Sequence, residues 1–295
     1  MKSIFLPVTP QSMAVAPLQA AARLALANQA TLNTLFIQND PRTIIPFLGE
    51  GLTADMMQSM YEAAEQEVQE QEHAAYQTFL KAMNKSGMPV REAPDSKPYG
   101  ANARWHVIQG SVGEQVGKRA RTADVAICLK PDTAISDTVE IFNDLIYHSG
   151  RPVIMVPPDF PEGQEHPKLA AFHYMNSLIA WNGSVECARA VAAARPFRWS
   201  DRIMHIVQIG ATKTGRAGLK DLALYLSEHR IDTCEVSAET DSQSVGAQIL
   251  AVAQAERSDI IIAGAYSHNR WRETVLGGVT KYLVTHSTMP VFFCH

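Results

Sequence analysis

The segment that decides the fold runs from residue 259 to residue 295, beginning Asp259-Ile260-Ile261-Ile262-Ala263-Gly264 and ending Pro290-Val291-Phe292-Phe293-Cys294. Both apolar runs predict buried strands. Between them, Gly277 and Gly278 open a short helical pattern beside Arg270, Arg272 and Lys281. Glycines let the backbone approach a ligand, and the unpaired amides and dipole of a helix start attract anions. The segment predicts a nucleotide phosphate site, or else a strand–helix–strand connection whose glycines serve tight packing.

Length, charge and cysteines limit the class of protein. The chain has 295 residues and a net charge of −4, without a long basic run. This length favours two domains, and the charge argues against nucleic acid as a partner. The four cysteines lie far apart, which is typical of free thiols in a reducing compartment. With neither a signal peptide nor a membrane-spanning run expected, we predict a cytoplasmic protein without a membrane partner.

Apolar runs of strand length alternate with helical patterns along most of the chain, which predicts parallel α/β sheets. The predicted strands are 4–8, 31–38, 105–109, 125–129 and 152–156 in the first half and 178–181, 203–209, 234–237, 260–263 and 290–294 in the second. The last strand is apolar to its end. We therefore expect a neighbour to cover it, either the other half of the chain or a second chain.

One long helical pattern interrupts this alternation at residues 53–85, with Thr53 as its cap and Gly87 after its end. One continuous helix of this length would span roughly 45–50 Å, and a break into two helices is the alternative. We interpret it as a surface helix with its apolar side on its own sheet. An arm that contacts a partner is the other interpretation.

The two halves of the chain repeat each other. Three pairs of segments match: Ser111-Val112-Gly113 with Ser244-Val245-Gly246, 121–125 with 257–260, and 148–153 with 286–291. The first half is the longer one, and the extra residues fall where the long helix lies. A proline-rich stretch at 157–167 separates the halves. We therefore predict domains at 1–158 and 170–295, the first enlarged by the helical insertion.

The chain resembles the universal stress proteins, in a form with two tandem domains. The resemblance rests on residues 179–184 (IAWNGS), on 259–264 (DIIIAG) and on the segment from Gly277-Gly278-Val279 to Pro290-Val291. It implies two five-stranded parallel sheets of order 3-2-1-4-5 with helices on both faces, a Rossmann-like fold of the adenine nucleotide alpha hydrolase type. Many members bind ATP or AMP.

The family's nucleotide motif is Gly, two residues, Gly, nine residues, Gly, then Ser or Thr. This chain holds Gly264, Ser267, Gly277 and Gly278 at those positions, so two of the four depart. Asn182 stands where nucleotide-binding members carry an acidic residue. In the first half, Thr9 stands at that position and no glycine turn follows the fourth strand, so we predict that this copy binds no nucleotide.

Ligands of open parallel sheets bind beyond the strand ends, where the winding direction reverses. With the implied strand order, that point lies between the strands ending at 181 and 263. Trp181 would either stack on a base or belong to the core. The residues predicted to line the site are Trp181, Asn182, Gly183, Gly210, Gly264, Ser267, Arg270, Gly277, Gly278 and Val279.

No catalytic motif stands out, neither GxxxxGK[ST] nor GxSxG. No His or Cys pair has metal-ligand spacing, so a metal or an organic cofactor is not expected. The first hypothesis is a stress-response protein that binds ATP or AMP, with or without Mg²⁺, in its second domain. The alternative is a scaffold without nucleotide that acts through protein partners or self-association. A slow ATP hydrolase ranks third.

Overall fold

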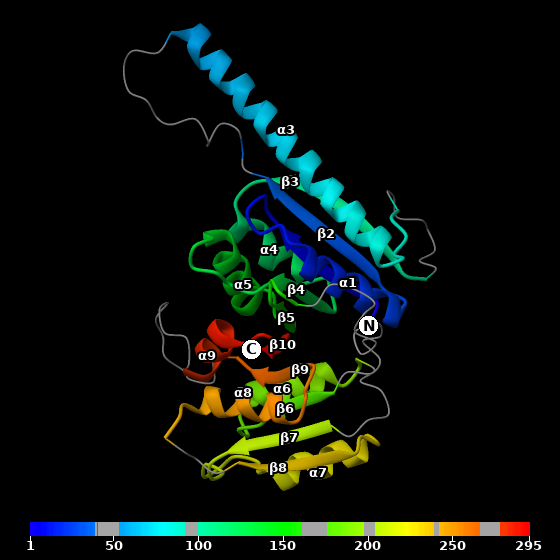
Figure 1. Cartoon of the computed structure of the whole chain (residues 1–295), viewed down its shortest axis with the longest axis vertical. Coiled ribbons are helices and arrows are strands. Elements are labelled where there is room, and N and C mark those ends of the chain that lie inside the picture. The colour runs from blue at the N-terminus through cyan, green and yellow to red at the C-terminus, as the bar shows by residue number, and fades with distance from the viewer. Residues whose placement is uncertain are drawn as a thin grey trace.

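The structure is a computed structural model that describes residues 1–38, 40, 53–91, 100–160, 176–197, 204–238, 242–265 and 278–295. These residues form one ten-stranded sheet of order β3-β2-β1-β4-β5-β10-β9-β6-β7-β8 (Figure 1). When the strands of each half are numbered along the chain, starting at β1 and at β6, both halves have the order 3-2-1-4-5. The α/β architecture and the strand order predicted from the sequence are confirmed.

The elements alternate along the chain as their apolar periods predict. The first half contains β1 (Ser3–Val8), α1 (Val15–Asn28), β2 (Thr31–Gln38), α3 (Ala54–Lys85), β3 (Asn102–Gln109), α4 (Val112–Ala120), β4 (Val125–Leu129), α5 (Ser136–His148) and β5 (Val153–Val156). The second half contains β6 (Ser177–Ala180), α6 (Val185–Ala194), β7 (Met204–Ile209), α7 (Leu219–Glu228), β8 (Thr233–Ala238), α8 (Val245–Ala255), β9 (Ile260–Gly264), α9 (Gly278–His286) and β10 (Val291–Cys294).

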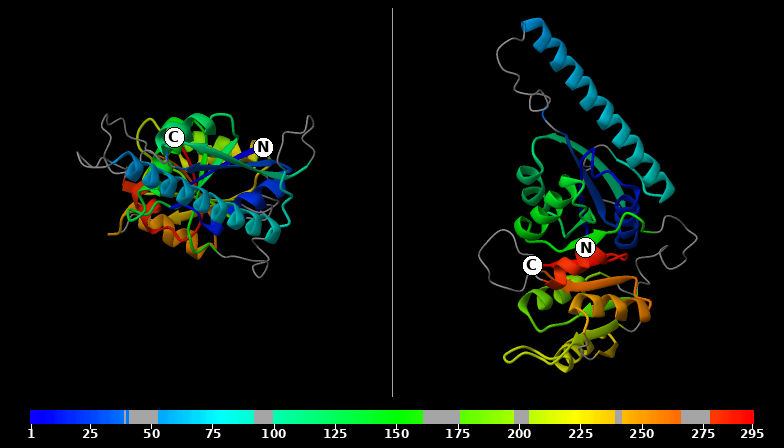
Figure 2. Two further views of the ribbon diagram at one scale, coloured as in Figure 1. Left: turned by 90° about the horizontal axis from the view of Figure 1, so that it is seen from above. Right: turned by 60° about the vertical axis from the view of Figure 1, so that its left-hand side comes forward.

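Two apolar layers cover the two faces of the sheet, and both layers run through both halves. Helices α1, α3, α6 and α7 bury their apolar residues on one face. Helices α4, α5, α8 and α9 do so on the other. The right-hand view of Figure 2 shows the strands of the first half between α3 (cyan) on one side and α4 and α5 (green) on the other. Successive strand residues alternate between the faces: Phe292 belongs to the first layer and Phe293 to the second. This alternation follows from the period of two in a strand.

The two halves meet edge to edge at β5 and β10, which pair antiparallel with Val291 opposite Met155 and Phe293 opposite Val153. Every other strand pair in this sheet is parallel. The predicted cover for the last strand is therefore confirmed, and the other half of the same chain provides it. Lys130 also crosses the junction, where its Nζ donates to the Ser287 carbonyl at 2.9 Å.

The repeated sequence motifs make repeated contacts. The Asp124 carboxylate accepts from the backbone of Lys2 and Ser3, and the Asp259 carboxylate accepts from the backbone of Asn176 at 2.8 Å. Asp124 precedes β4 and contacts the start of β1, and Asp259 precedes β9 and contacts the residue before β6. The two contacts therefore occupy equivalent places in the two halves. The hydroxyls of Ser149 and Ser287 likewise accept from the amide two residues on, at 3.0 and 3.3 Å. These matched contacts support the interpretation of the chain as a duplicated fold.

The long helix α3 is unbroken over 32 residues, with Thr53 Oγ1 accepting from Met56 N. Its C-terminal part packs on the sheet through buried Ala75, Phe79 and Met83, in the same core as α1. Its N-terminal part extends beyond the edge of the sheet (Figure 1). The interpretation as a surface helix therefore holds for the C-terminal part of α3.

The cysteines differ in accessibility, and this predicts an order of reaction. Cys128 and Cys187 are buried, whereas Cys234 is exposed. Burial raises the pKa of the Cys128 and Cys187 thiols, so little thiolate forms. We expect iodoacetamide at neutral pH to label Cys234 first and to label the two buried thiols only after denaturation. Peptide mass spectrometry against time tests this order. Labelling of Cys128 in the folded protein at the rate of Cys234 would contradict the packing described.

Candidate functional site

The candidate site lies at the carboxyl ends of β6 and β9, where the strand order of the second half reverses. These strands pair in parallel with Ala180 opposite Ala263, so both end at the same edge of the sheet. Helix α6 follows β6, and α9 connects β9 to the parallel strand β10. Both helices therefore begin at that edge. Two helix starts beside two strand ends are the arrangement in which open α/β sheets bind anions.

The turn between β6 and α6 is held by its own side chains. Asn182 Oδ1 accepts from Ser184 N at 2.9 Å, and Ser184 Oγ caps the helix by accepting from Cys187 N at 3.2 Å. Gly183 has φ +67°, a conformation that favours glycine. The Asn182 side-chain oxygen is therefore used to hold the turn.

Gly264 serves close packing between β9 and α6. A Cβ at this position would lie 2.6 Å from Cys187 N and 2.8 Å from the Glu186 carbonyl carbon. The start of α6 therefore rests directly on the end of β9. This is the packing role that the sequence left open for these glycines, and it brings one helix start to the predicted anion edge.

The loop after β7 closes one side of the site, and the sequence analysis missed its main contact. The Arg216 guanidinium donates to the Asn182 carbonyl at 3.1 Å, and a Cβ on Gly183 would lie 2.5 Å from the Ala217 carbonyl oxygen. Gly210 begins this loop, and its carbonyl accepts from the Gln208 side chain at 3.3 Å. The run of cations that follows Gly210, from Lys213 to Lys220, was the available signal for a charged loop at this edge.

Trp181 belongs to the core. Its side chain is 7% exposed, and its indole Nε1 donates to the Ala217 carbonyl at 3.0 Å.

Nearby, burial raises the pKa of the Cys187 thiol, and hydrogen bonds from Gly264, Asn182 and Ser184 do not offset that rise. The thiol is therefore mostly protonated at physiological pH. Within the described residues no group of three or more His, Cys, Asp and Glu side chains could hold a metal.

The start of α9 is open toward the described residues. Gly278 is exposed, and a Cβ placed on it meets no atom of the described residues within 4 Å. In the described part of the chain, neither Gly278 N nor Val279 N donates to a residue outside the helix. Ser267, Arg270 and Gly277, which the sequence also predicts for this site, lie outside the described residues.

The corresponding edge of the first half is internally satisfied. Thr9 and Ser12 are buried and bond each other through Thr9 N to Ser12 Oγ at 2.8 Å and Ser12 N to Thr9 Oγ1 at 3.1 Å. Beyond β4, Thr138 Oγ1 accepts from Asp132 N at 2.8 Å. That the first half binds no nucleotide stays a prediction.

The fold and the edge site define a tandem, doubly wound α/β protein. The model of the universal stress protein family matches residues 150–295. A universal stress protein from Archaeoglobus fulgidus DSM 4304 superposes with a TM-score of 0.60 and 16% identity, over 99% of this chain and 96% of that one. A protein of the same family from Pseudomonas aeruginosa UCBPP-PA14 does so with a TM-score of 0.52 and 11% identity, over 100% and 93%.

At these identities the structural likeness concerns the fold alone. No curated protein matches the sequence. With the family model on its second half, the chain belongs to the universal stress protein family. The same fold extends over its whole length. No helix in the described ranges is long and apolar enough to cross a membrane.

Proposed function

We propose that this protein is an adenine-nucleotide-binding regulator in the stress response, with ATP or AMP bound in the second half at the ends of β6 and β9. The observation that carries the proposal is the start of α9. A Cβ on Gly278 would meet no described atom within 4 Å, and the amides of Gly278 and Val279 have no partner outside the helix in the described part of the chain. Backbone amides at a helix start are suited to a phosphate group.

The charge around the edge supports an anionic ligand. Arg216 lies on the loop that closes the β6 side, where one of its two terminal guanidinium nitrogens bonds the Asn182 carbonyl. Lys213 is exposed on the same loop, and Lys281 on the first turn of α9 is exposed. Glu186 also lies at this edge, on the first turn of α6. The proposal is binding without rapid turnover.

A charged residue at the start of α9 tests the proposal. We expect Gly278→Glu to weaken ATP and AMP binding at least about tenfold, because the new carboxylate repels phosphate while it suits the positive end of the helix dipole and keeps the helix folded. Gly278→Gln is the matched control with the same size and no charge, and it should retain most of the affinity. Isothermal titration calorimetry measures both. Equal affinities for the two variants, or no heat from the unmodified protein at millimolar ATP and AMP, would contradict the proposal.

The second candidate is a scaffold that acts through protein contacts without nucleotide. It is favoured by the β6 side of the site, where Asn182 is committed to its own turn and Ala217 lies directly against Gly183. Mass spectrometry of small molecules released by denaturing the purified protein separates the two candidates. ATP or AMP in equimolar amount supports the first, and its absence together with silent calorimetry supports the second.

A further inference from the structure

A pocket lies in the first half of the chain, at the opposite end of the sheet order from the carboxyl ends of β6 and β9. It is an open pocket of about 420 Å³ between α3 and the outer strand β3. Gln69, Glu72, His73 and Tyr76 line it from one side of α3, Trp105 from β3, and Val90 and Arg91 from the chain between them. Its size is within the range of small-molecule sites.

The walls of this pocket are rigid. Trp105 stacks on Phe36 with ring centroids 5.4 Å apart and contacts Phe79 at 5.1 Å and Tyr76 at 5.6 Å. The segment around Val90 adds to the edge of β3, where Arg91 N donates to the Ala103 carbonyl at 2.9 Å. The aromatic surface is therefore held in place before any ligand arrives, which lowers the ordering cost of binding.

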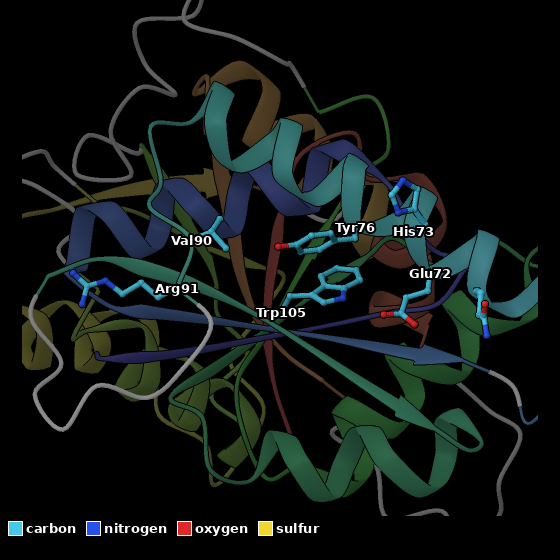
Figure 3. A pocket seen from close by; sticks show the side chains of 7 residues that line it. Glu72, His73, Tyr76, Val90, Arg91 and Trp105 are labelled. Atoms are coloured by element: carbon cyan, nitrogen blue, oxygen red, sulfur yellow. The ribbon is translucent and has the colours of Figure 1, made fainter.

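Glu72 and Arg91 bring opposite charges to the lining of the pocket. Glu72 is partly buried, and Figure 3 shows its carboxylate directed toward Trp105 while the Arg91 guanidinium is directed away from both aromatic rings. The acidic residues of α3 all lie in its first two thirds, and its lysines lie at the far end: Asp55, Glu62, Glu65, Glu67, Glu70 and Glu72 against Lys81 and Lys85. Aromatic faces beside a carboxylate favour a cation.

We propose that this pocket binds a small organic ammonium compound. The ammonium group lies by the Glu72 carboxylate and the Tyr76 and Trp105 rings. The pocket shares no residue with the edge formed by β6 and β9, so this ligand and the nucleotide would not compete for one site.

Nuclear magnetic resonance of the full-length, nitrogen-15-labelled protein tests the proposal through the indole N–H signals of its four tryptophans. Comparison with Trp105→Phe identifies the Trp105 signal. The probes are phenylethanolamine, the neutral 1-phenyl-1,2-ethanediol and the anionic mandelate, which share one ring and one hydroxyl and differ in charge. We expect phenylethanolamine to shift the Trp105 signal saturably, with the diol about tenfold weaker and mandelate weaker still.

Two variants locate the charge. Glu72→Gln should weaken phenylethanolamine binding about tenfold, because it removes the paired carboxylate. Glu70→Gln makes the same change of charge at an exposed position two residues away, on the other side of α3, and should change the affinity less than about twofold. Equal effects of the two variants, equal binding of the three probes, or an unmoved Trp105 signal would each overturn the proposal.

Discussion

Phe292→Ala is expected to destabilise the protein by about 3–5 kcal/mol, the range for removing a large buried aromatic side chain. Phe292 is 0% exposed and lies in β10, the strand that joins the halves. Its ring contacts Phe197 edge-on at a centroid distance of 5.3 Å. The residues opposite and beside it belong to both halves, so neither half alone closes the cavity that the substitution leaves.

Urea unfolding followed by circular dichroism measures this loss of stability. Leu224→Ala is the control, because Leu224 is 64% exposed on α7 and should change the free energy of unfolding by less than about 0.5 kcal/mol. A loss below about 1 kcal/mol for Phe292→Ala would mean that β10 does not form the shared core described.

Gly264→Ala is expected to destabilise the protein by about 1–3 kcal/mol, the usual cost of overpacking. The added methyl group would lie 2.6 Å from Cys187 N and 2.8 Å from the Glu186 carbonyl carbon. Both are backbone atoms of the first turn of α6, so no side-chain rotation relieves the contact. The helix start must move away from the strand end.

Gly278→Ala is the matched control, because its added methyl group would meet no atom within 4 Å. Its free energy of unfolding should lie within about 0.5 kcal/mol of the unmodified protein, since alanine suits a helix better than glycine. The same denaturant titrations compare the two variants. Equal stabilities for Gly264→Ala and Gly278→Ala would contradict the close contact between β9 and α6.

Much of the fold could be predicted because apolar periodicity and repeated motifs are local signals. The strand order and the covering of β10 follow from such patterns together with the family resemblance, whereas the pattern at residues 53–85 left open whether α3 is one helix or two. The sequence left open which neighbour covers β10, because an apolar edge strand does not specify its partner. The structure identifies that partner as β5.

The sequence could predict which edge of the sheet carries the candidate residues, but it could not predict most of their contacts. Gly264, Gly183 and Asn182 lie at the expected edge, yet what each one touches depends on how α6 and the loop after β7 pack. Arg216 was missed because a loop has no periodic pattern, so the sequence does not indicate which atoms a cation in the loop will contact. The same holds for the pocket at Trp105, which needs α3 and β3 in register.

The central claim is that nucleotide binds the second half at the edge formed by β6, β9 and α9. Hydrogen–deuterium exchange with and without millimolar ATP or AMP tests it most directly. The account predicts slower exchange at residues 278–281 and around 182–184 on nucleotide addition, with no change at residues 9–12 of the first half. Unchanged exchange in the second half, or protection confined to the first half, would contradict it.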